Sequence, residues 1–180
     1  MLVLHGYINP AVYNTLAYTT RYADALARAG LLDNYRATIH WENLPALREE
    51  RGIDFVTANG ENLAGGMGLS RSTAAALLSN GVDVVTSGNH IWDKREIYDY
   101  LTRQAKLLRP ANYPDDLPGS GSVVVKATNG VQCAVMNLQG RVFMPLTDCP
   151  FRLAEKEVQR IARETRIIVI DFHAEATSEN

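Results

Sequence analysis

Apolar and polar positions along the chain follow two periods, which alternate from about residue 42 onward. Short buried strands are predicted where apolar residues run together, at 53–58 (IDFVTA), 82–87 (VDVVTS) and 166–172 (RIIVIDF). Amphipathic helices are predicted at 41–52, 70–81, 93–104 and 152–164. Alternating strands and helices are typical of βαβ units with a largely parallel sheet, so we expect the α/β fold class.

One pair of strands departs from this alternation. Residues 122–138 are predicted to form a β-hairpin, because Asn129-Gly130 separates two apolar runs and favours a type I′ turn. The first part of the chain is less regular, with a helical pattern at 14–30 and a weak strand pattern at 36–41. We expect a single α/β domain over 1–180, with an atypical segment at 1–43 and a regular core at 44–180.

Composition narrows the class of protein without identifying a function. The 180 residues are 46% hydrophobic and 21% charged with a net charge of −2, as in soluble globular proteins. There is no polybasic run to indicate binding to nucleic acid or membranes, and no apolar segment long enough to span a bilayer. We therefore expect a cytoplasmic protein. Cys133 and Cys149 lack metal-site spacing and are expected to be reduced thiols without a catalytic role.

Three predicted strands end in residues that can bind metal ions. The first is followed by NGEN (59–62), the second by GNH (88–90) and the last by His173. Ligands collect at the carboxyl ends of strands in open α/β sheets, and carboxylate, amide and imidazole donors suit Mn, Fe or Zn. On this basis Asn89 is an oxygen ligand. His90 lies beside the metal, where it protonates a leaving oxygen or stabilises a phosphoryl oxygen.

Each of these residues also has a structural interpretation. An asparagine such as Asn89 before a histidine is more often a turn or cap residue. Taken alone, His173 is more typical of a strand-end histidine with satisfied hydrogen bonds, and Glu61 could cap the turn that follows it. The coincidence of donors at three strand ends favours the functional interpretation.

Five segments resemble, in order and spacing, the YmdB-type branch of the calcineurin-like metallophosphoesterases: ANGEN-AGG, GNHIWDK, LLRPANYP, NLQGRVFMP-DCPF and DFHAEATSE. The resemblance extends from about residue 44 to residue 179. It implies a sandwich of two sheets flanked by helices. It also implies a phosphodiesterase that acts on 2′,3′-cyclic nucleotides and related phosphodiesters with two divalent ions, iron or manganese, which activate water and offset charge on the phosphoryl oxygens.

The resemblance also implies roles for individual residues. By matching motif, Glu61 resembles the carboxylate that bridges the two ions, and Asn62 resembles a ligand of the first ion. Asn89 and His173 resemble ligands of the second ion. His90 resembles the catalytic histidine of the GNH motif.

Two arginines lie within the motif segments. Arg141, in QGRVFMP, is a candidate phosphate contact, although a solvent-facing or structural arginine fits the sequence equally well. Arg109, in LLRPANYP, is expected to be structural.

Residues 25–49 have a weak resemblance to the PfpI-like domain of AraC-type regulators, without the cysteine of its active site. That second resemblance therefore implies no catalytic residue here.

Two departures from the family pattern bear on activity. The family's first strand ends in Gly-Asp, whose aspartate binds the first metal, whereas this chain has Gly6-Tyr7. The family continues into a Gly-Thr-His-Thr-His-type motif, whereas this sequence stops at Asn180. We therefore expect a sandwich incomplete at its C-terminus and a half-equipped site that binds one ion or none, the second position filling first. His5 is a weak candidate for a replacement ligand.

Two functions follow from these observations. The leading hypothesis is a metal-dependent phosphodiesterase of the 2′,3′-cyclic nucleotide type, or a derivative with impaired activity, whose partner is a small phosphodiester. The alternative is a non-catalytic α/β module that binds a metal, a nucleotide or a protein without turnover. An incomplete sandwich leaves apolar surface uncovered, so we also expect copies of the chain to associate and share ligands.

Overall fold

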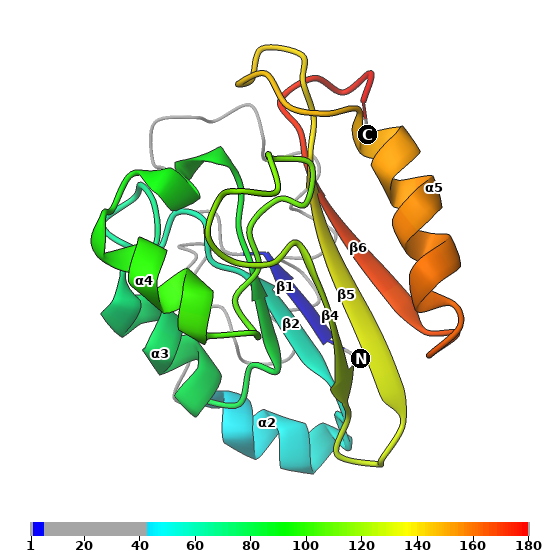
Figure 1. Ribbon diagram of the computed structural model, residues 1–180. Coiled ribbons are helices and arrows are strands. Elements are labelled where there is room, and N and C mark those ends of the chain that lie inside the picture. Colours follow the sequence, from blue (N-terminus) through cyan, green and yellow to red (C-terminus); the bar gives the residue numbers. More distant parts are fainter. Residues whose placement is uncertain (1, 6–42, 180) are drawn as a thin grey trace.

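The computed structural model describes residues 2–5 and 43–179 (Figure 1). In order, the elements are β1 (Leu2–His5), α2 (Leu44–Arg51), β2 (Val56–Asn59), α3 (Arg71–Ser79), β3 (Val84–Thr86), the 3₁₀ helix η3 (Asn89–Trp92), α4 (Glu96–Arg103), β4 (Ser122–Lys126), β5 (Gln132–Gln139), α5 (Pro150–Ile161) and β6 (Ile168–His173). Each strand and helix expected within the core is present. The helical pattern at 14–30 and the strand pattern at 36–41 lie outside the described residues.

The strands form two three-stranded sheets. The first has the order β1-β2-β3 and is parallel throughout. The second has the order β4-β5-β6, with β4 antiparallel and β6 parallel to β5. Helices α2, α3 and α4 lie beside the first sheet and α5 lies beside the second (Figure 1). The expected α/β sandwich of two sheets flanked by helices is therefore confirmed.

Strand alternation separates the buried side chains into two apolar layers. Val56 and Ala58 of β2 pack with buried residues of α2, α3 and α4. Phe55, just before β2, and Val84 of β3 pack with Cys133 and other residues of the second sheet. The first layer attaches the helices to their sheet, and the second holds the two sheets together.

The layer between the sheets becomes polar toward the carboxyl ends of the strands. On β6, the apolar Val169 is followed on the same face by Asp171 and His173. On β2 and β3, the last residues are the buried Asn59 and Thr86. Polar side chains from both sheets therefore share one end of the sandwich.

The start of α3 is as predicted from the sequence. Ser70 Oγ accepts a hydrogen bond from Thr73 N at 3.1 Å, and Thr73 Oγ1 accepts one from Ser70 N at 3.0 Å. This reciprocal pair is a capping box, which satisfies backbone donors that the first turn leaves free. The helix therefore begins directly after the Gly-rich loop that holds Glu61.

The predicted type I′ turn of the hairpin is wrong. Gly130 has a φ of 87°, but Asn129 is not among the described residues with positive φ, and a type I′ turn needs both. Asn129 instead bonds through its side chain: Oδ1 accepts from Val131 N at 3.0 Å and Nδ2 donates to Asp54 Oδ2 at 2.8 Å. These bonds fasten the turn to the residues before β2 and select a conformation with one left-handed residue.

Both cysteines are free thiols, as expected. Cys133 is buried between the sheets, and burial raises the pKa of its thiol. Cys149 precedes α5, where a hydrogen bond from the backbone of Arg152 lowers the pKa of its thiol. Among the described helices, none combines the length and apolar character needed to cross a membrane.

Candidate active site

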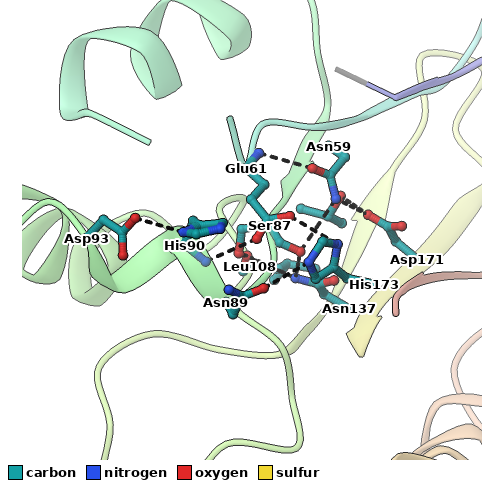
Figure 2. Close-up of polar contacts among 11 residues, drawn as sticks. Asn59, Glu61, Ser87, Asn89, His90, Asp93, Leu108, Asn137, Asp171 and His173 are labelled. Atoms are coloured by element: carbon teal, nitrogen blue, oxygen red, sulfur yellow. Dashed lines mark hydrogen bonds and ion pairs between the residues drawn. The ribbon is translucent and has the colours of Figure 1, made fainter. Parts of the chain in front are cut away.

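Three predicted ligands meet at the carboxyl ends of β2, β3 and β6 (Figure 2). Glu61 follows β2, Asn89 begins η3 just after β3, and His173 ends β6. His173 Nδ1 lies 3.0 Å from Glu61 Oε2, and His173 Nε2 lies 3.0 Å from Asn89 Oδ1. The shared strand ends expected from the sequence therefore bring together donors from both sheets.

The carboxylate of Glu61 is buried and held from two sides. Its Oε1 accepts a hydrogen bond from His90 N at 3.0 Å, and its backbone N–H donates to Asn59 Oδ1 at 3.0 Å. The carboxylate lies so close to Gly88 that a Cβ there would overlap it. Because Oε1 binds the loop after β3 and Oε2 faces His173, these contacts of the carboxylate reach other elements of the fold. They do not cap its own turn.

Burial dominates the electrostatics of Glu61. The residue is 2% exposed, and this desolvation raises the pKa of its carboxyl group above the ordinary value, although His173 acts in the opposite direction. A nearby cation would favour the ionised form. The arrangement therefore suits a carboxylate that is paired with positive charge.

The imidazole of His90 lies on the outer side of this cluster. His90 Nδ1 is 2.8 Å from Asp93 Oδ2, and the side chain of His90 is 37% exposed. An ionised carboxylate only accepts hydrogen bonds, so Nδ1 carries the proton and Nε2 is the nitrogen available to a ligand. The backbone bond from His90 to Glu61 links this ring to the buried cluster.

Two candidate residues are not brought into this network. Asn62 is half-buried beside Glu61, and among the described residues no hydrogen bond joins its side chain to the other candidates. Arg141 has an exposed side chain, and its backbone N–H donates to the Glu179 carboxylate at 2.9 and 3.0 Å. Its guanidinium makes no recorded contact with the cluster, so the role of Arg141 as a phosphate contact stays a prediction.

Arg109 is structural, as expected. Its side chain is buried, and its guanidinium donates to Pro110 O at 2.9 Å and Pro114 O at 3.3 Å. Burial lowers the pKa of this guanidinium below its ordinary value. Arg109 therefore shapes the segment beside the end of β5.

Three polar residues of the site were not identified from the sequence. Asp93 binds the ring of His90, while Asn59 and Asp171 bind each other to one side of Glu61 (Figure 2). Asp171 lies two residues before His173, so strand alternation could have placed both on one face. Asn59 is the last residue of its strand, and only its contact with the other sheet reveals its role.

These donors could supply part of the ligand set of one divalent cation. A carboxylate, an amide oxygen and an imidazole are suitable ligands for manganese or iron. In the part of the chain that the structure describes, no group of three or more His, Cys, Asp or Glu side chains could hold a metal, so Asn89 must supply a donor. An imidazole binds a metal through one nitrogen. Metal binding by His173 therefore replaces its hydrogen bond to Glu61 or its hydrogen bond to Asn89.

The candidate replacement ligand lies at the edge of the described residues. His5 ends β1, and its backbone lies in register with Asn59 of β2. The end of β1 thus belongs to the same edge of the sheet as the cluster. Its role as a ligand stays a prediction.

The fold and the site together have the architecture of the calcineurin-like metallophosphoesterases. Two sheets pack face to face with helices on their outer faces, and carboxylate, amide and imidazole donors lie at shared strand ends. Residues 34–180 match the family described as YmdB-like protein. The chain belongs to this family, which confirms the resemblance seen in its motifs. It is 47% identical over 138 residues to a 2′,3′-cyclic-nucleotide 2′-phosphodiesterase of Bacillus subtilis (strain 168), covering 77% of this chain and 52% of that protein.

Solved structures support the same assignment. A hypothetical protein from Thermus thermophilus matches with a TM-score of 0.65 and 38% identity, over 77% of this chain and 53% of that one. A novel phosphatase from Mycoplasma pneumoniae matches with a TM-score of 0.67 and 31% identity, over 77% of this chain and 50% of that one. The chain thus spans about half the length of the relatives it matches.

Proposed function

We propose that this chain contains the core of a metal-dependent phosphodiesterase that hydrolyses 2′,3′-cyclic nucleotides. The observation that supports the proposal is the contact of Glu61 with both His173 and the backbone of His90. This contact joins a buried group of metal-type donors to an exposed imidazole. The activity of the Bacillus subtilis relative, as its name states it, supports the choice of substrate.

Glu61, Asn89 and His173 would hold one divalent ion, and Glu61 with Asn62 would contribute to a second, with manganese or iron as the metal. The buried carboxylate of Glu61 supports this assignment, because burial favours pairing with positive charge. The chemistry supplied by bound divalent ions is activation of water and offset of charge on the phosphoryl oxygens. The protein residues supply orientation and a proton.

His90 would act as the general acid. With both ring nitrogens protonated, its Nε2–H donates a proton to the ribose oxygen that leaves with the electron pair of the broken P–O bond, while the oxygen of water forms the new bond to phosphorus and that water releases one proton to solvent. Asp93 holds Nδ1 at 2.8 Å and leaves Nε2 free for the substrate. The exposure of the His90 ring gives a phosphodiester direct access to it.

The test is hydrolysis of 2′,3′-cyclic AMP by the purified chain with added manganese, followed by chromatography of the products. We expect turnover that is lost in Glu61→Ala, Asn89→Ala and His90→Ala, while His90→Ala keeps its bound manganese. Arg109→Lys serves as a control for the packing of the neighbouring segment. Wild-type turnover in all three alanine variants contradicts the proposal.

A non-catalytic binding module is the second candidate. It is favoured by the two hydrogen bonds of His173, which occupy both ring nitrogens that could bind a metal. No hydrolysis of any phosphodiester, whether or not manganese binds, supports this alternative. Manganese bound with turnover rejects it.

A further inference from the structure

We propose that Asp171 is a positioning residue that holds Glu61 and His173, which come from different sheets, in their relative places. The proposal gains its catalytic meaning from the proposed function above, because Glu61 and His173 are the metal ligands of that function. The contacts that support it exist in the protein without any metal. They can therefore be tested separately.

The carboxylate of Asp171 joins β6 to the ends of β2 and β3. Its Oδ2 accepts a hydrogen bond from Asn59 Nδ2 at 2.9 Å (Figure 2). It accepts a second hydrogen bond from Thr86 Oγ1. Asn59 is 8% exposed and Thr86 1% exposed, so both donors are largely withdrawn from water. Removal of the carboxylate would leave Asn59 Nδ2 with only Ser87 O at 3.5 Å and Thr86 Oγ1 with only Ala58 O at 3.4 Å. Both distances are long for hydrogen bonds, so these buried donors would be poorly satisfied.

The Asn59 amide transmits this contact to Glu61. Its Nδ2 donates to Asp171 and its Oδ1 accepts from Glu61 N at 3.0 Å. An amide can rotate to exchange its oxygen and nitrogen, but an ionised carboxylate accepts only, so Asp171 requires Nδ2 on its own side. Asn59 Oδ1 is thereby directed at the backbone of Glu61.

Asp171 acts on His173 through the strand that they share. The two residues are two positions apart on β6, so their side chains lie on the same face. That face meets β2 and β3 through side chains, because β6 pairs only with β5 among the described strands. The bonds of Asp171 therefore help to set how far His173 lies from Glu61 and Asn89.

The first test compares Asp171→Ala with wild type in the absence of metal, by amide hydrogen exchange at Glu61. The Glu61 N–H donates to Asn59 Oδ1, so loss of the fixed amide should speed its exchange at least about tenfold. The second test is titration with manganese. Loss of a hydrogen-bond partner that orients metal ligands should weaken binding about 10- to 100-fold.

Asp171→Asn and Asp54→Ala are the matched variants. The introduced asparagine keeps an oxygen that can accept from both donors but no longer excludes a rotated Asn59 amide, so Glu61 exchange and manganese affinity should lie between those of wild type and Asp171→Ala. Asp54 binds Asn129 and Thr128 at the hairpin turn. Asp54→Ala should lower stability to urea. It should change neither the manganese affinity nor the exchange rate of Glu61 N–H once that rate is corrected for global unfolding.

Asn59→Ala breaks the same link from the other side and keeps the bond between Thr86 and Asp171. Because it also removes the acceptor of Glu61 N–H, it marks the exchange rate of a fully broken link. If Asp171→Ala does not fold, Thr86→Val, which removes the other donor to Asp171, provides the test. Glu61 exchange that is unchanged when the bonds of Asp171 are lost overturns the proposal. So does an Asp171→Asn variant as impaired as Asp171→Ala, because charge and not hydrogen bonding would then be responsible.

The two proposals fail in different ways. If the wild-type chain binds no manganese and hydrolyses no cyclic nucleotide, the proposed function fails, while the exchange experiment still decides the role of Asp171. If manganese binds and turnover occurs but Glu61 exchange does not depend on Asp171, the positioning role fails alone.

Discussion

Two largely buried polar clusters lie at opposite ends of β2 and β3, and their hydrogen bonds and charges differ. At the amino ends, Arg48 Nη1 lies 2.9 Å from Asp83 Oδ2, and Arg48 also donates to the carbonyl oxygens of Gly81 and Asp54. Asp83 Oδ2 accepts a further bond from Val56 N at 2.8 Å. Here one positive and one negative charge face each other, and backbone groups complete the set.

At the carboxyl ends, the charges do not match in this way. Glu61 and Asp171 contribute two carboxylates, and the group in contact with Glu61 that can bear positive charge is the imidazole of His173. A buried side-chain oxygen without a hydrogen-bond partner, Asn137 Oδ1, also lies near this end. Among the described residues, the Arg48–Asp83 cluster has no such atom.

The difference distinguishes a stabilising cluster from a binding cluster. Buried polar groups are normally paired, so a closed set such as Arg48 with Asp83 contributes to holding the fold together. An excess of acceptors at shared strand ends is instead what a cation or a polar ligand requires. The predictions below change one cluster at a time, in order of decreasing expected effect.

Arg48→Met should have the largest effect, and it should act on stability alone. The change leaves the partly buried Asp83 carboxylate without its cation, which should lower the free energy of unfolding by about 3 kcal/mol, the lower end of the loss for a buried pair. Urea unfolding measures this loss. Arg51→Met is the control, because the Arg51–Glu50 pair is exposed and should contribute less than about 1 kcal/mol. Equal losses in both variants would remove the distinction between the clusters.

Glu61→Gln should weaken manganese binding while leaving the fold nearly intact. The glutamine keeps the size of the side chain but removes the negative charge of a proposed ligand. Loss of a residue that hydrogen-bonds a metal ligand weakens binding by up to about 100-fold, so loss of the ligand's charge should weaken manganese affinity at least that much. Calorimetric titration measures it. Glu164→Gln, at an exposed carboxylate at the end of α5, should leave affinity unchanged. A similar affinity for wild type and Glu61→Gln would contradict the metal assignment.

Asp93→Asn should reduce turnover without changing metal affinity. Asparagine can present either an oxygen or a nitrogen to His90 Nδ1, so the proton is no longer fixed there and kcat should fall about tenfold, the value of one hydrogen bond to a charged group. Hydrolysis of 2′,3′-cyclic AMP measures this, and the ¹⁵N shifts of the His90 ring report the tautomer independently. Asp99→Asn, an exposed residue of α4, is the control. An unchanged tautomer would show that Asp93 does not orient the ring.

The smallest effect is a pH dependence outside both clusters. A hydrogen bond from Arg160 lowers the pKa of the Glu157 carboxyl below its ordinary value of 4.5. A carboxylate with a lowered pKa in the folded state contributes stability above that ordinary value, and the contribution disappears as the pH falls through the folded pKa. The stability difference between wild type and Glu157→Gln should therefore be at most about 1 kcal/mol at pH 7 and vanish below both pKa values. A difference that persists at low pH would require another cause.

The sequence predicted most of the local structure correctly. The helix at 70–81, the hairpin at 122–138 and the strand that ends at His173 depend on residues near one another in the chain. The type I′ turn was wrong because Asn129 bonds to Asp54, which lies far away in the sequence. Arg141 shows the same limit, since Glu179 binds its backbone while its side chain stays exposed.

The sequence by itself determined the alternation of strands and helices, the donors at three strand ends and the motifs of the YmdB-like family. Periodicity and motif spacing are local properties of the chain, so they can be read before it folds. Only the tertiary structure decided that Asp171 bonds to Asn59 and Thr86, and that His173 lies between Glu61 and Asn89. These contacts join two sheets that pack through side chains, and their relative placement follows from the whole buried layer between them.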